Sequence, residues 1–159
     1  MAKKPVARRR PATRKSKPKA KPKAKRPVRK KPETLRLGSV MPSLTVNDVR
    51  ATLKWYRDVL GFTVASEWTY EARLGGAVLR AGTVEFMIGQ DDFAKGRDRH
   101  KGEGFRLYCS TRQDLDQLAA WIKSRGGVLA HEPTDQPWGV RDFSVVDPDG
   151  YKISIAQGK

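Results

Sequence analysis

Few residues in this chain have the types and spacing that chemistry would need. His100 stands in a charged, glycine-containing stretch typical of a solvated segment, and His131 is followed directly by Glu132. Neighbouring residues of a strand point to opposite faces, so His131 and Glu132 cannot bind one metal ion together. The single cysteine, Cys109, cannot form an internal disulfide, and it lies in a strand-like run typical of an inert thiol. The sequence contains no GxSxG motif and no glycine-rich phosphate loop.

Two further carboxylates, Asp147 and Asp149, stand in the stretch "VDPDGYKISIAQ". The proline and glycine that accompany them predict a tight turn, so we interpret the carboxylates as turn formers. The stretch is also too short for a calcium loop. After the turn, alternation places Tyr151, Ile153 and Ile155 on a core face. It places Ser154 on the second face, with Lys152 and Ala156, which must meet either water or a cavity.

The elements around these residues repeat. Helical spacing of apolar residues predicts helices within 47–62 and 111–127, the first capped by Asn47 or Asp48 and ended by Gly61. Strand-like runs occupy 42–46, 62–68, 72–80, 83–89, 104–110, 128–132, 140–147 and 151–157. Each half of the body therefore reads β, α, β, β, β.

Charge divides the chain. Residues 1–32 hold 16 of the 33 basic residues, six of the ten prolines and no Asp or Glu, which leaves 17 basic against 17 acidic residues beyond them. This composition predicts a disordered tail over 1–37. Its positive charge favours nonspecific binding to nucleic acid, carried by Arg8, Arg9, Arg10, Lys15, Lys17, Lys19, Lys21, Lys23, Lys25 and Arg26. A solubilising tail, or one that meets an anionic membrane, is the alternative.

The stretches "PSLTVNDVRATLKWYRDVLGF" and "WGVRDFSVVDPDGYKISI" resemble the vicinal oxygen chelate superfamily, which includes glyoxalase I, extradiol dioxygenases, fosfomycin resistance enzymes and bleomycin resistance proteins. The resemblance implies an α+β domain over 38–159, in which two βαβββ modules form a curved mixed sheet around a cleft. The modules would span about 41–90 and 104–157, with 91–103 as their linker.

Enzymes of this superfamily hold a divalent metal with His, Gln or Glu side chains on the first and last strand of each module. Aligned on this chain, those positions fall at Met41, Met87, Arg106 or Leu107, and Ser154. Methionine is a soft ligand and a protonated serine is a poor one, so the alignment predicts a domain without metal or other cofactor. A metal-dependent lyase or dioxygenase with misplaced ligands stays the enzymatic alternative.

The segment "QPWGVRDF" is similar to bleomycin resistance proteins, which lack the metal cage and sequester the drug across a homodimer interface. The resemblance implies a homodimer that binds a flat aromatic or glycopeptide antibiotic. The single cysteine predicts a cytoplasmic protein. The candidate binding residues are Trp68, Glu85, Met87, Trp138, Arg141 and Ser154. The tryptophans could instead belong to the core or a dimer interface, and Glu85 could form an ion pair.

Two consequences concern location and partners. No stretch approaches the roughly 18 apolar residues of a membrane span. If the tail binds DNA, the protein would associate with the nucleoid. A third alternative for the function is a nucleic-acid-associated protein, in which the folded body only forms the dimer.

Overall fold

A computed structural model describes residues 35 and 37–158, and its elements follow the expected order twice. The first module holds β1 (Ser43–Val46), α1 (Val49–Asp58), β2 (Thr63–Tyr70), β3 (Arg73–Ala81) and β4 (Val84–Gln90). The second holds β5 (Arg106–Thr111), α2 (Leu115–Ser124), β6 (Leu129–Asp135), β7 (Arg141–Val146) and β8 (Lys152–Gln157). The expected pair of βαβββ modules is confirmed.

Short side chains set the starts of both helices. The Asp48 carboxylate accepts hydrogen bonds from the backbone N–H groups of Arg50, at 3.0 Å, and Ala51, at 3.1 Å. It therefore satisfies two of the donors that a helix leaves free at its start. Asp114 caps α2 in the same way, through the N–H of Gln117 at 2.9 Å. Of the two caps considered for the first helix, the structure selects Asp48.

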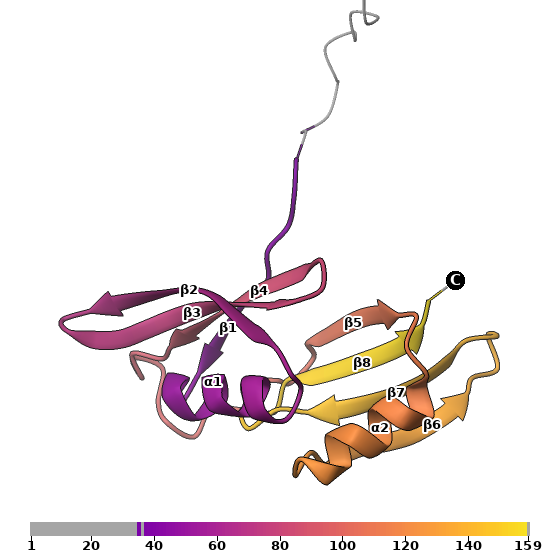
Figure 1. The fold of residues 1–159 in the computed structure, drawn as a ribbon. Helices are drawn as coiled ribbons and strands as arrows, with labels where there is room; N and C mark the ends of the chain where they lie inside the picture. Colours follow the sequence, from indigo (N-terminus) through magenta and orange to yellow (C-terminus); the bar gives the residue numbers. More distant parts are fainter. Residues whose placement is uncertain (1–34, 36, 159) are drawn as a thin grey trace, which may run out of the picture. The chain divides into compact units, whose positions relative to one another are not determined.

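Each module forms its own four-stranded sheet (Figure 1). The strand order is β1-β4-β3-β2 in the first sheet and β5-β8-β7-β6 in the second. The pairs β1–β4 and β5–β8 are parallel and the others antiparallel, so both sheets are mixed. α1 packs on β3 and β4, and α2 packs on β6, β7 and β8. The fold is α+β, as the sequence indicated.

Strand β2 is the outer strand of the first sheet and pairs with β3 alone. All eight of its residues are exposed. Its register shifts between Val64 and Ser66 and again between Trp68 and Thr69. Such irregularities bend a strand and increase its local twist. β2 is therefore an uncovered and irregular edge.

The helix-covered faces of both sheets meet in a shared core. Buried residues of the first module, such as Leu44 and Phe86, form one cluster with Tyr151 and Ile153 of the second module. A second cluster surrounds α2, and Trp55 and Leu60 of the first module pack against both clusters. We call the face of each sheet opposite its helix the open face. Both open faces point away from the shared core.

The turn between β7 and β8 fastens the second module to α1. Tyr56 donates its hydroxyl hydrogen to the buried Asp147 carboxylate at 2.8 Å, and Thr52 donates to Asp149 at 2.9 Å. Asp147 also accepts from the backbone N–H of Asp149 and of Tyr151, at 2.9 and 2.8 Å. The interpretation as a turn former holds for Asp147, whereas the Asp149 carboxylate binds Thr52 and the backbone N–H of Asn47 outside the turn. Burial raises the pKa of Asp147.

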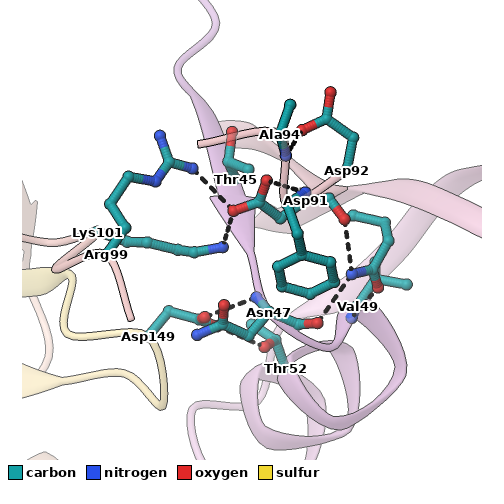
Figure 2. Close-up of polar contacts among 12 residues, drawn as sticks. Thr45, Asn47, Val49, Thr52, Asp91, Asp92, Ala94, Arg99, Lys101 and Asp149 are labelled. Carbon is teal, nitrogen blue, oxygen red and sulfur yellow. Dashed lines mark hydrogen bonds and ion pairs between the residues drawn. The ribbon is translucent and has the colours of Figure 1, made fainter. Parts of the chain in front are cut away.

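The segment between the modules is anchored by a buried ion pair (Figure 2). Asp91 is 6% exposed, and its carboxylate accepts from Lys101, from Arg99 at 2.8 Å and from the N–H of Phe93 at 2.9 Å. The Lys101 side chain is 1% exposed. Hydrogen bonding from Lys101, the largest cause, holds the pKa of Asp91 well below its usual range. The sequence indicated a charged linker but not that two of its charges are buried.

Replacing Asp91 with Asn should destabilise the protein by about 3 kcal/mol or more, because it leaves a buried ammonium without its counter-ion. Urea unfolding of wild type and variant would measure the loss. Asp92→Asn is the matched control, since Asp92 is exposed and its carboxylate accepts one hydrogen bond, from the N–H of Ala94. Equal stability of the two variants would contradict a buried ion pair.

The same ion pair sets a pH dependence. Because the folded-state pKa of Asp91 is depressed, its stabilisation is present above the carboxyl pKa of the unfolded chain, about 3.9, and fades as pH falls through the lower folded-state value. The stability difference between wild type and Asp91→Asn should therefore shrink below about pH 4. A difference that grows on acidification would contradict this sign.

Candidate ligand-binding site

Three of the six candidate binding residues gather on the open face of the first sheet. Met87 and Glu85 alternate along β4, and Trp68 lies on β2 opposite Gly76. The Trp68 indole covers Gly76 so closely that a Cβ there would lie 2.0 Å from its Cζ2 atom. Because Trp68 is still 40% exposed, its ring forms part of the accessible surface. This face offers an aromatic ring, a thioether and a carboxylate.

The carboxylate on this face already has a partner. Arg80 lies opposite Glu85 in the β3–β4 register and donates its Nε hydrogen to Glu85 at 2.6 Å. The ion pair is partly exposed, with 30% of the Glu85 side chain accessible. Glu85 therefore contributes to this face as half of a neutral pair rather than as a free anion.

Ser154 lies on the open face of the second sheet but below its surface. It is 0% exposed, and its Oγ atom lies 2.8 Å from the Oγ of Ser144, its register partner on β7. Tyr108 stands on the other side of Ser154, on β5, and is 56% exposed. The two hydroxyls satisfy one another. Contact with a ligand would require the side chains above them to move.

Ser154→Ala should destabilise the protein by about 1 to 2 kcal/mol, because Ser144 is left with an unsatisfied buried hydroxyl. The double variant Ser144→Ala/Ser154→Ala should be more stable than either single variant, since removing both partners removes the penalty. A double-mutant cycle by chemical unfolding measures the coupling. Strict additivity would contradict the hydroxyl pair.

The last two candidate binding residues lie at the β6–β7 hairpin. Trp138 is 68% exposed in the connecting turn, which the bond from Gln136 N to Val140 O closes at 2.9 Å. Arg141 begins β7 and binds Asp116 of α2 at 2.8 Å and Asp135, the last residue of β6, at 3.2 Å. Trp138 is therefore exposed in a turn, whereas Arg141 is held in ion pairs with two carboxylates.

A polar group lies on the second open face, where His131, which the sequence offered only beside Glu132, meets Asp142 and Gln136. His131 Nε2 lies 3.1 Å from Asp142 Oδ1, and Gln136 donates to the same oxygen at 2.7 Å. Asp142 is 4% exposed, whereas 37% of the His131 side chain is accessible. The signal in the sequence was an Asp inside a predicted strand, whose neighbours in the sequence, Arg141 and Phe143, occupy the opposite face.

The positions aligned with metal ligands do not form a donor set. Met41 precedes β1, and the strand residue opposite Met87 is Ser43. In the second module Ser154 lies opposite Tyr108, and not opposite Arg106 or Leu107, the two expected positions. Among the residues described, no three His, Cys, Asp or Glu side chains gather as a metal site would require. Thioether and hydroxyl groups do not fit the divalent ion of the superfamily's enzymes.

Comparison with known proteins defines the family. Residues 36–155 match the model of the Glyoxalase/Bleomycin resistance protein/Dioxygenase superfamily, and the chain belongs to this superfamily. Bleomycin resistance proteins of Geobacillus stearothermophilus and Staphylococcus aureus are each 30% identical to it over 131 residues, which cover 74% of this chain and 94% of theirs.

Solved structures agree on the fold. TioX from Micromonospora sp. ML1 has a TM-score of 0.61 at 20% identity, over 76% of this chain and 98% of its own. A glyoxalase/bleomycin resistance protein/dioxygenase from Nocardioides has a TM-score of 0.63 at 17% identity, over 79% of this chain and 86% of its own. At these identities the likeness concerns the fold alone.

The basic tail residues proposed to bind nucleic acid, Arg8 to Arg26, lie outside the described residues. Within the part of the chain that is described, no helix has the length and apolar character to cross a membrane.

Proposed function

We propose that this protein binds a flat, partly aromatic small molecule reversibly and without transforming it, as in antibiotic sequestration. The observation that carries the proposal is the exposed aromatic and thioether surface formed by Trp68 and Met87 on a face with no metal donor set. Aromatic rings add stacking to the area that they bury, which suits a flat ligand. The bleomycin resistance proteins at 30% identity support the same function.

The binding cleft is proposed to require a homodimer. Both open faces point away from the shared core, so one chain does not bring its own two faces together. A second copy can place the open face of its second sheet against the open face of the first. Trp68 and Met87 of one chain would then share a cleft with Trp138 and Tyr108 of the other.

Trp68→Ala and Trp138→Ala should each weaken ligand binding by about tenfold, because each removes a stacking ring worth on the order of 1 kcal/mol beyond burial. Bleomycin is the first ligand to test, by isothermal titration calorimetry with the full-length protein. The thermal midpoint should change little, since 40% of Trp68 and 68% of Trp138 are already exposed.

Trp121→Ala is the matched control for these variants. Trp121 is 39% exposed on α2, outside both open faces, where Arg125 stacks 4.6 Å from its ring centroid. Its truncation should leave affinity unchanged. Recovery of unmodified ligand after long incubation would separate sequestration from turnover. A monomer that binds neither bleomycin nor any of a panel of flat aromatic compounds would contradict the proposed function.

We propose a second, separate role for the tail, which is nonspecific binding to nucleic acid. The supporting observation is 16 basic residues and no acidic residue in residues 1–32. Closely spaced cations displace the counter-ions of a phosphate backbone and so favour association. The tail has no aromatic residue for stacking on bases, so no sequence preference is expected.

Removing residues 1–32 should abolish DNA binding, measured by fluorescence anisotropy with two duplexes of unrelated sequence. In the full-length protein, affinity should be equal for both duplexes and should fall steeply with salt, with a log–log slope of about −0.9 per phosphate contacted. Bleomycin binding should survive the truncation. A truncated protein that binds DNA as tightly as the full chain would contradict the role of the tail.

A further inference from the structure

The second open face contains a buried carboxylate, that of Asp142. Among the described residues, only His131 could neutralise it, and only when its imidazole is protonated. Asp142 is the second residue of β7 and its side chain is 6% exposed. Its two side-chain partners, His131 and Gln136, are neutral donors when the imidazole is unprotonated. Burying a carboxylate without a counter-ion costs several kcal/mol. A group kept at such a cost in an open face is a candidate for function.

One oxygen of this carboxylate remains available. Both hydrogen bonds to Asp142 among residues 37–158 end at Oδ1. Within the same residues, no fully buried side-chain polar atom lacks a hydrogen-bond partner. Oδ2 therefore keeps contact with solvent while the rest of the side chain is covered. It is an acceptor without a hydrogen-bond partner among residues 37–158, on a carboxylate held in place by two donors at its companion oxygen.

The residues around Asp142 on this face are uncharged. The nearest register partners on β8, β5 and β6 are Ala156, Ser110 and Thr134, and none of them carries a charge. The cations of this face, Arg106 and Lys152, lie at its other end, four strand positions or about 13 Å along β8. Arg141 adjoins Asp142 in sequence but binds Asp116 on the helix side. Hydroxyl groups of Ser144, Ser154 and Tyr108 lie between the two charged ends.

We infer that Asp142 receives a cationic group of the ligand, such as a protonated amine or amidine attached to a flat ring. The inference rests on the proposed function, because it assigns one end of the same binding face. His131 and Gln136 act as positioning residues that fix the carboxylate, and Oδ2 accepts the hydrogen bond from the ligand cation. The ring then extends along the second open face toward the exposed Tyr108, above the side chains that cover Ser144 and Ser154.

The test uses two probes of one ring frame, 9-aminoacridine, which is cationic, and acridone, which is neutral. Titration calorimetry with the full-length protein is carried out at about pH 8, where imidazole side chains are ordinarily neutral. Wild type should prefer the cation by about tenfold, the difference expected for a charge-assisted hydrogen bond. Asp142→Asn should reduce this preference to about twofold or less, because it keeps the shape and removes the charge.

Asp135→Asn is the matched control. It also removes one negative charge from β6 and β7, but the Asp135 side chain is 83% exposed and bound to Arg141. The preference of the Asp135→Asn variant for 9-aminoacridine over acridone should equal that of wild type. If Asp142→Asn fails to fold, His131→Lys supplies the same test, since it keeps Asp142 and places a permanent cation beside it. Circular dichroism verifies the fold of each variant.

The outcomes separate the two proposals. If both probes bind and the cation preference persists in Asp142→Asn or His131→Lys, the assignment of Asp142 is overturned while the proposed function stands. Equal affinity of wild type for both probes would also overturn the assignment of Asp142 and leave the proposed function standing. If wild type binds neither probe, both the cation site and the binding of flat aromatic ligands are contradicted. Loss of the preference in the Asp142 variant alone, with Asp135→Asn unaffected, supports the inference.

Discussion

The arrangement of the two modules depends on the turn that follows β7. Its carboxylates bind α1 from across the molecule, Asp147 through the Tyr56 hydroxyl and Asp149 through Thr52 and the backbone N–H of Asn47. Because Asp147 is buried and its pKa is raised by that burial, each hydrogen bond to it offsets part of a desolvation cost. A polar seam of this kind fixes orientation more narrowly than apolar contact, since displacement would leave a buried charge unsatisfied.

That orientation decides which surfaces remain for function. The buried apolar residues of both sheets and of α1 lie in the shared core, so the faces that the sheets present to the outside include polar and aromatic side chains. The first face offers a ring and a thioether beside a neutral ion pair, and the second offers hydroxyls with charges at its two ends. The two faces are chemically unlike, which suits a ligand with an aromatic part and a separate polar part.

Local rules in the sequence predicted the elements and their order well. Asp48 as a cap, the apolar stripe of α1 and the alternation of β8 each follow from neighbouring residues, so a short window suffices. Burial on the open faces could not be predicted in this way. Alternation assigned Ser154 to the second face, but its 0% exposure depends on Ser144 and on side chains from another strand. The Asp91–Lys101 pair and the His131–Asp142 contact likewise join residues about ten positions apart through tertiary structure.

The irregular edge formed by β2 has a consequence for how the protein stays in solution. An outer strand with eight exposed residues offers unpaired backbone groups to the outer strand of any other molecule. The residues after position 32 carry equal numbers of acidic and basic side chains, so charge repulsion would not keep two such bodies apart. The two register shifts in β2 oppose this growth, because a bent and twisted strand cannot align along its length with a flat partner. The shape of this edge, and the charge of the tail, then limit the growth of extended sheets between molecules.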